Sequence, residues 1–147
     1  MKIGEQDSQS LAVTSKGTVI LLPVEIVKQI YAMEQVQEIA GKEGQFSIKS
    51  TEYSGYFLYD LLGQDTEDIK YAVLLQNDDL ECVLFVSHII NVITLGKPCR
   101  LPFYMDCPNF SYIEACYELK GNQIGYQLKL QTLIHERILE QEALYGV

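Results

Sequence analysis

The stretch from Tyr71 to Leu95 constrains the fold of this chain more than any other part of the sequence. Two apolar runs, Tyr71–Leu75 and Cys82–Val86, are rich in β-branched and aromatic residues and are separated by a polar segment, Gln76–Asp79. This pattern predicts two strands joined by a turn. Because neither run alternates strictly, we expect both faces of this hairpin to be covered, at the centre of the core. The apolar run Ile89–Leu95 predicts a further strand.

Shorter strand patterns lie on both sides of the central hairpin. They are Leu11–Thr14, Thr18–Leu22, Gln45–Ser50, Tyr56–Tyr59, Tyr112–Leu119 and Ile124–Leu130. Turns are predicted at Ser15–Gly17, Thr51–Gly55 and Lys120–Gln123. Together these patterns predict about nine short strands, without the alternation of strands and helices that is typical of parallel sheets.

Three segments favour other structures. Pro23–Ile30 is expected to begin with a short helical turn, because proline is tolerated at the first position of a helix. The periodicity of Tyr31–Ala40 leaves strand and helix both open. The tail Gln131–Leu144 has apolar residues at helical spacing, which predicts a terminal helix.

The size of the chain fits one domain, residues 1–147, with a single core or two small β subdomains that share one. Nearly half of the residues are apolar and about a fifth are charged, which is typical of a globular protein. The polar leader Met1–Ser10 is expected to be partly mobile. It has no hydrophobic signal core, and no apolar run reaches the roughly 18 residues that span a membrane. We therefore expect a cytoplasmic protein that does not insert into membranes.

The net charge of −9 argues against nucleic acid as a partner, because phosphate contacts need clustered lysine and arginine. The four cysteines, at positions 82, 99, 107 and 116, have no CxxC pair and no zinc-binding spacing. We expect them to act as small buried hydrophobic residues. The sequence has no glycine-rich phosphate loop, so no cofactor is predicted. Nothing in it specifies an oligomeric state.

Two groups of residues are possible chemical sites. Cys82 and His88 would form a nucleophilic pair only if thiol and imidazole lay within hydrogen-bond distance. The acidic residues of Asp65–Asp68 and Asp78–Glu81 would bind a cation only if the two loops converged, and they lack the alternating spacing of a calcium loop. For both groups a structural role is the favoured interpretation, so neither a catalytic nor a metal site is predicted.

The order of these segments resembles the CheW-like domains, which are adaptor modules of bacterial chemotaxis signalling. The segments that carry the resemblance are PVEIVKQI (23–30), YFLYDLLG (56–63), YAVLL (71–75), LFVSHIINVITL (84–95) and the late hairpin YIEACYELKGNQIGYQLKLQTL (112–133). The resemblance covers roughly Thr18 to Glu136. It implies a mainly β fold of two small SH3-like five-stranded barrels that share a hydrophobic core, followed by a C-terminal helix.

The resemblance also implies a function and a contact surface. It implies a non-catalytic adaptor, without a cofactor, that couples the cytoplasmic region of a chemoreceptor to a chemotaxis-type histidine kinase. Val27 and Gln29 would lie on the partner-binding surface, and Glu52 would stand at or near the position of a family arginine. The chain departs from the family pattern at three positions: Glu52 stands at or near an arginine of the family, Gln29 replaces a glutamate and Ser87 replaces an aspartate. The alternative is a sensor of small molecules or peptides on the same fold, with no role in chemotaxis.

Overall fold

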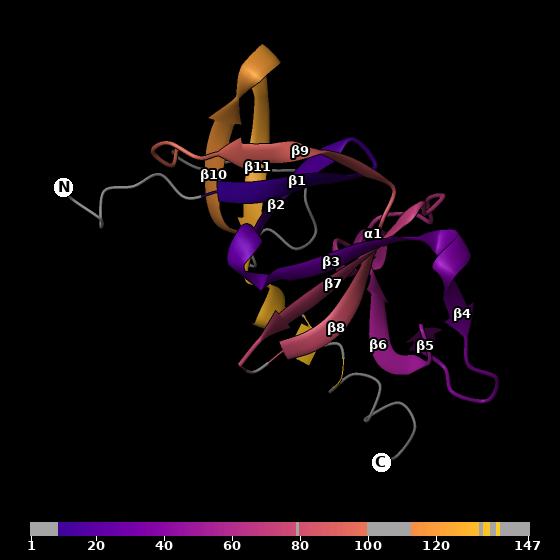
Figure 1. Cartoon of the computed structure of the whole chain (residues 1–147). Helices are drawn as coiled ribbons and strands as arrows, with labels where there is room; N and C mark the ends of the chain where they lie inside the picture. The colour runs from indigo at the N-terminus through magenta and orange to yellow at the C-terminus, as the bar shows by residue number, and fades with distance from the viewer. Residues whose placement is uncertain (1–8, 79, 100–112, 133, 136–137, 139–147) are drawn as a thin grey trace.

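Eleven strands form two sheets in the computed structural model, which describes residues 9–78, 80–99, 113–132, 134, 135 and 138. One sheet has the order β10-β11-β2-β1-β9, with β10 (Ile113–Leu119), β11 (Gln123–Leu128), β2 (Thr18–Pro23), β1 (Gln9–Ser15) and β9 (His88–Thr94). The other has the order β3-β7-β8-β6-β5-β4, with β3 (Val27–Ala32), β7 (Tyr71–Asn77), β8 (Leu80–Val86), β6 (Thr51–Phe57), β5 (Gln45–Ile48) and β4 (Val36–Glu38). Figure 1 shows the five-stranded sheet above the six-stranded sheet.

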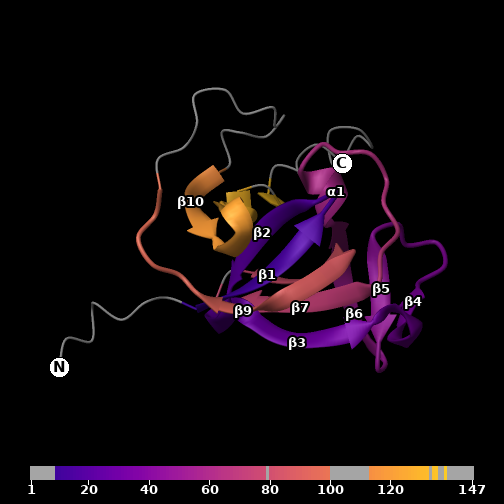
Figure 2. The same cartoon turned by 90° about the horizontal axis from the view of Figure 1, so that it is seen from above.

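In the described part of the chain, four short helical segments connect the strands. They are η2 (Val24–Ile26), η3 (Met33–Gln35), α1 (Leu58–Leu61) and η5 (Lys120–Asn122). In the view from above, α1 lies close to the ends of β1 and β2, although it directly follows β6 of the other sheet (Figure 2). The helix therefore lies where the two sheets approach each other.

The two sheets share one hydrophobic core. Its buried members come from β1, β2, β10 and β11 of the five-stranded sheet and from β7 and β8 of the six-stranded sheet, with α1 between them. Leu22, Leu58, Leu75 and Leu84 are each fully inaccessible to solvent within this cluster. Two smaller clusters lie inside the individual sheets, one around Phe85 and the other around Leu21. The expectation of a mainly β fold with a shared core is thus confirmed.

The central hairpin is confirmed as well. β7 and β8 pair in antiparallel register from Tyr71↔Val86 to Asn77↔Leu80, and each has neighbours on both sides in the sheet. Their apolar residues are buried, including Leu75 and Phe85. A strand that is covered on both faces needs no polar alternation, which is why these runs are continuously apolar.

The turn predicted at Thr51–Gly55 is wrong. These residues belong to β6, and the chain reverses two residues earlier, where Lys49 and Ser50 have φ angles of 50° and 69°. A two-residue hairpin turn requires this left-handed backbone, and glycine or asparagine usually supplies it. Because this turn contains neither glycine nor asparagine, the sequence did not mark its position.

Several boundaries also differ from the predictions. Tyr56–Tyr59 was expected to be a strand, but β6 ends at Phe57 and α1 begins at Leu58, whose side chain is buried in the shared core. The helical turn expected after Pro23 is confirmed as the three residues of η2, and β3 follows it. Tyr31–Ala40, which periodicity left open, contains the end of β3, then η3 and β4. The six-stranded sheet has one strand more than expected.

The two ends of the chain are described only in part. Gln9 and Ser10 of the expected leader begin β1, and residues 1–8 lie outside the described residues. Of the expected terminal helix, positions 131, 132, 134, 135 and 138 are helical, as is position 130 before it. The remaining positions of that prediction, and the expected strand position Tyr112, lie outside the described part of the chain.

Candidate protein-binding surface

Two of the residues expected to contact a partner lie on β3, at one edge of the six-stranded sheet. Val27 pairs with Leu75 and Gln29 with Leu74 on β7, and the register shifts between them, so that Lys28 forms a bulge. Val27 is half-buried and packs against the shared core, whereas Gln29 is exposed. Ile30, the next residue, is 37% exposed. The edge of β3 therefore presents polar and apolar side chains to solvent.

Glu52 lies on β6, where it pairs with Ser47 of β5. Its carboxylate forms an ion pair with Lys42, whose Nζ lies 3.3 Å from Oε1, and both side chains are more than half exposed. Exposed pairs of this kind contribute about 0–1 kcal/mol to stability. Glu52 is therefore available for contact with another molecule, and its replacement does not threaten the fold.

The structure does not bring the three expected residues into one strand pair. β7 and β8 lie between β3 and β6 in the strand order, so Glu52 is separated from Val27 and Gln29 by two strands of the sheet. Val27 and Gln29 lie close together on one edge. A partner that contacted all three would have to extend across the sheet.

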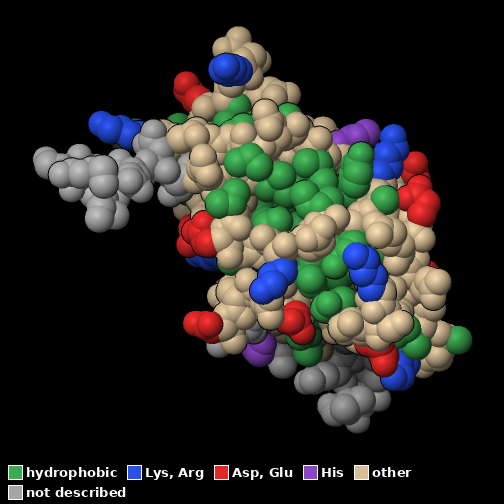
Figure 3. All heavy atoms as spheres, viewed as in Figure 1, with side chains coloured by type: hydrophobic (Ala, Val, Ile, Leu, Met, Phe, Trp, Pro, Cys, Tyr) green, Lys and Arg blue, Asp and Glu red, His purple; other side chains and the backbone are tan. Residues whose placement is uncertain are grey.

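The five-stranded sheet presents an apolar surface along β9, which forms one of its edges. Ile90 is 51% exposed and Val92 is 48% exposed. A groove of about 480 Å³ runs between Ile90–Thr94 and the β10–β11 hairpin, where Glu118–Lys120 and Gln123 line it. In Figure 3 hydrophobic side chains gather over this part of the molecule. Contiguous exposed apolar surface of this kind often marks a protein interaction site.

Sequence reasoning identified the strand at Ile89–Leu95 but missed its exposure. An apolar run reads alike whether it lies inside a core or along an edge, because the pattern does not record the neighbours of the strand. The bulge opposite Ala12 and Val13, which leaves Ile90 unpaired with β1, depends on strand register and has no mark in the sequence. No local signal would have identified this surface.

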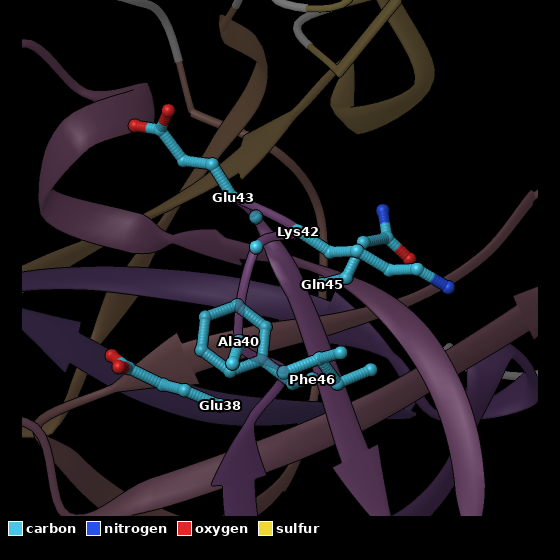
Figure 4. A pocket seen from close by; sticks show the side chains of 9 residues that line it. Glu38, Ala40, Lys42, Glu43, Gln45 and Phe46 are labelled. Carbon is cyan, nitrogen blue, oxygen red and sulfur yellow. The ribbon is translucent and has the colours of Figure 1, made fainter.

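A second hollow lies at the loop between β4 and β5 and is shown in Figure 4. It has a volume of about 610 Å³ and is lined only by the consecutive residues Glu38–Phe46. The carboxylates of Glu38 and Glu43 lie well apart on the left of the view, and Lys42 extends to the right (Figure 4). Because these charged groups do not converge on one point, the hollow lacks the arrangement of a ligand site.

Cys82 and His88 are placed differently with respect to solvent. Cys82 is buried in the shared core, where loss of hydration raises the pKa of its thiol to about 12. His88 begins β9 and is exposed. A nucleophilic thiol needs a lowered pKa and an adjacent base. The environment of Cys82 has the opposite effect, so the structure gives this pair no support as a nucleophilic site.

The acidic side chains of the described residues do not gather into a cation site. Within the described ranges, no group of three or more histidine, cysteine, aspartate or glutamate side chains is arranged to hold a metal ion. Glu67, from the acidic loop, instead accepts a hydrogen bond from the backbone N–H of Lys16 at 2.8 Å. Asp79 lies outside the described residues. None of the helices in the described part of the chain combines the length and the apolar composition needed to cross a membrane.

Comparison with known proteins gives a result only at the level of structure. No protein-family model and no curated protein matches this sequence. Among solved structures, the chain is similar to the scaffolding protein TtCheW from Thermoanaerobacter tengcongensis, with a TM-score of 0.70. The similarity covers 86% of this chain and 92% of the TtCheW chain, at 12% sequence identity. This chain therefore has the fold of a CheW scaffolding protein on a highly divergent sequence.

Proposed function

We propose that this chain is a non-catalytic signalling adaptor that couples the cytoplasmic region of a chemoreceptor to a histidine kinase. The observation that carries the proposal is the similarity to TtCheW, a scaffolding protein, over nearly the full length of both chains. The order of the segments in the sequence supports the same proposal. The adaptor acts in the cytoplasm as one domain, residues 1–147.

The exposed surfaces support protein binding more than catalysis. Protein interfaces combine an apolar centre with a polar rim, and they require no convergent set of titratable groups. Ile90 and Val92 supply exposed apolar area on one sheet, and the edge of β3 with Val27 and Gln29 supplies a mixed surface on the other. We assign the partner contacts of β3 to Val27 and Gln29, and those of β6 to Glu52.

Glu52 determines which partner fits, because its charge is opposite to that of the arginine expected there from the resemblance. A carboxylate at an interface favours a partner with a basic patch and disfavours an acidic one. The adaptor therefore pairs with a kinase or receptor whose surface is basic at the corresponding position.

The test is a pull-down from the native cell extract with the wild-type protein, Glu52→Arg and Gln29→Ala side by side, with bound proteins identified by mass spectrometry. Glu114→Arg is the matched control, since Glu114 is an exposed acidic residue on β10 of the other sheet. We expect the wild type and the control to recover a histidine kinase or a receptor. Glu52→Arg and Gln29→Ala are expected to recover at least tenfold less of that kinase or receptor.

The pull-down tests the proposed function and the assigned contact residues separately. If the wild type recovers neither a kinase nor a receptor, the adaptor proposal is wrong. If it recovers one of them and the two variants bind equally well, the function stands and the assignment of Gln29 and Glu52 is wrong. Val27→Ala is a third variant. Because Val27 packs against the core, its binding is compared with that of the wild type at equal concentrations of folded protein.

The second candidate function is a peptide-binding or small-molecule-binding module. The groove of about 480 Å³ beside β9 favours it, because its volume is within the range of ligand pockets. This candidate predicts that Ile90→Lys abolishes binding of a captured peptide or metabolite, while kinase and receptor are absent from the pull-down. Mass spectrometry of small molecules released from the purified protein identifies that ligand.

A further inference from the structure

Cys99 and Cys116 face each other across an isolated antiparallel bridge. The backbone N–H of Cys99 donates a hydrogen bond to the carbonyl of Cys116 at 2.7 Å. The two sulfur atoms lie 2.8 Å apart, and both thiols are free. Facing residues of an antiparallel pair have Cα atoms about 4.5–5.5 Å apart, which is within the range that a disulfide requires. The sulfurs need to approach by less than about 1 Å to bond.

This bridge occupies a specific place in the topology. β9 and β10 are the two outer strands of the five-stranded sheet. Cys99 follows the last residue of β9, Thr94, by five positions, and it pairs with the middle of β10. The bridge therefore pairs the segment that follows β9 with the outer strand β10. A covalent bond between the sulfurs would fix this segment to β10.

The two thiols have different environments. Cys116 is fully buried, and burial together with the neighbouring Cys99 thiol raises the pKa of Cys116 to about 11. Cys99 is partly exposed. Since an oxidant reaches the less buried residue first, Cys99 is the thiol that reacts with it, and Cys116 is the thiol that closes the bond.

We propose that Cys99 and Cys116 are an oxidation site that converts reversibly between two thiols and an intramolecular disulfide. With hydrogen peroxide as oxidant, the Cys99 sulfur takes one oxygen to give a sulfenic acid, and one water is released. The Cys116 sulfur then attacks that sulfur, and the hydroxyl leaves with the thiol proton as a second water. Contact between the two sulfurs at 2.8 Å makes this step intramolecular, which offsets the raised pKa of Cys116. The two thiols lose two electrons and two protons in total, and a small thiol reductant restores them by exchange.

The disulfide would constrain the unfolded chain between positions 99 and 116. The cross-link lowers the entropy of the unfolded chain and so stabilises the folded state. For a loop of this length in a protein of this size, the melting temperature is expected to rise by about 5–10 °C. The inference does not depend on the proposed adaptor function, since it concerns the attachment of the segment after β9 to β10 and not a partner surface.

The test uses the full chain with Cys82→Ala and Cys107→Ala, so that only Cys99 and Cys116 remain. Tryptic cleavage places Cys99 in peptide 71–100 and Cys116 in peptide 101–120. After treatment with a small excess of hydrogen peroxide, the non-reduced digest is expected to contain these two peptides linked, and dithiothreitol is expected to separate them. The wild type is treated in parallel, with free thiols counted by a maleimide reagent before and after oxidation.

The expected result is loss of two thiols per chain, a linked 71–100/101–120 peptide and a melting temperature higher by about 5–10 °C in the oxidised form. Adding Cys99→Ser to the two-cysteine protein is the matched control and abolishes both the link and the shift. The inference is overturned if the linked species is a dimer between two chains, if the sulfurs oxidise to sulfonic acids without linking, or if the wild type links Cys107 instead of this pair.

Discussion

Gly55 lies on β6 where two phenylalanine rings approach the backbone. A Cβ atom added there would be 2.5 Å from Cδ2 of Phe46 and 2.6 Å from Cε2 of Phe85. The rings themselves pack edge to face with centroids 4.7 Å apart, so neither can move without disturbing the other. The absence of a side chain at position 55 thus allows this part of the core to close.

We predict that Gly55→Ala lowers the free energy of unfolding by about 1–3 kcal/mol, because overpacking of a close-packed core forces side chains off their preferred rotamers. Urea unfolding followed by circular dichroism measures the change. Gly96→Ala is the matched control, since a Cβ there has no neighbour within 4 Å, and it is expected to change stability by less than about 0.5 kcal/mol. Equal effects of the two substitutions would contradict this account of the core.

Cys82 makes stability depend on pH in the alkaline range. Burial raises the pKa of its thiol to about 12 in the native state, whereas an unfolded cysteine has a pKa of about 8.5. The native state therefore holds this proton more tightly. The resulting stabilisation is fully present below pH ~8.5 and is lost as the pH rises towards 12.

We predict that the free energy of unfolding falls more steeply with pH in the wild type than in Cys82→Ala. The difference between the two slopes approaches about 1.4 kcal/mol per pH unit between pH ~9 and ~11. Denaturant titrations at a series of pH values measure it, and the other titrating groups are common to both proteins. Parallel curves would show that Cys82 ionises in the native state as easily as in the unfolded chain.

At the scale of elements, Ser87 lies where the chain passes from β8 of the six-stranded sheet to β9 of the five-stranded sheet. It is 2% exposed, and its hydroxyl donates a hydrogen bond to the carbonyl oxygen of Thr14 on β1 at 3.0 Å. Serine thus stands where the CheW-like pattern has aspartate, and in this chain the position requires a donor. A carboxylate there would face a carbonyl oxygen.

We predict that Ser87→Ala costs about 1 kcal/mol of stability and that Ser87→Asp costs more, about 2–4 kcal/mol, because a buried charge without a donor is penalised further. Thermal and urea unfolding of both variants give the ranking. A stabilising effect of aspartate would mean that the local structure rearranges to supply a donor.

The elements were predictable where one local signal determined them. The runs Tyr71–Leu75 and Cys82–Val86 gave the central hairpin correctly, since a continuously apolar strand implies cover on both faces. The turn before β6 was not predictable, because Lys49 and Ser50 take a backbone conformation that their side chains do not signal. The exposure of Ile90 and Val92 was also hidden, since it depends on which strand lies beside β9.

At the scale of the whole molecule, the shared core links the stability of the two sheets. Leu22 of β2 and Leu84 of β8 belong to different sheets, yet both are fully buried in the same cluster. Neither sheet could lose its partner without exposing this apolar surface to water.

We predict that the chain unfolds as a single cooperative unit. Leu22→Ala is expected to cost about 2–5 kcal/mol and to lower the hydrogen-exchange protection of β7 and β8 in the other sheet as much as that of β1. Exchange followed by mass spectrometry resolves the strands. Protection lost from the five-stranded sheet alone would show two independent units and would contradict the single-domain proposal.

The fold was predictable as a whole because the order of weak segments, and not any one motif, resembled CheW-like domains. The structural similarity to TtCheW confirms that prediction at 12% identity, where no family model matches. The partner-binding residues remain predictions. Exposed positions such as Gln29 and Glu52 are not constrained by packing, so the physics that determines the fold does not determine them.

The parallel pairing of β11 with β2 has a consequence for the synthesis of the chain. Val19 pairs with Gly125, more than a hundred positions further along. On the ribosome β1 and β2 emerge first, but the outer edge of β2 stays open for about 5–20 s until β11 has been made. That edge, TVILLP, carries no charged residue to block wrong pairing. The β1–β2 hairpin is therefore open to aggregation during this interval, and it is a segment on which a chaperone would act.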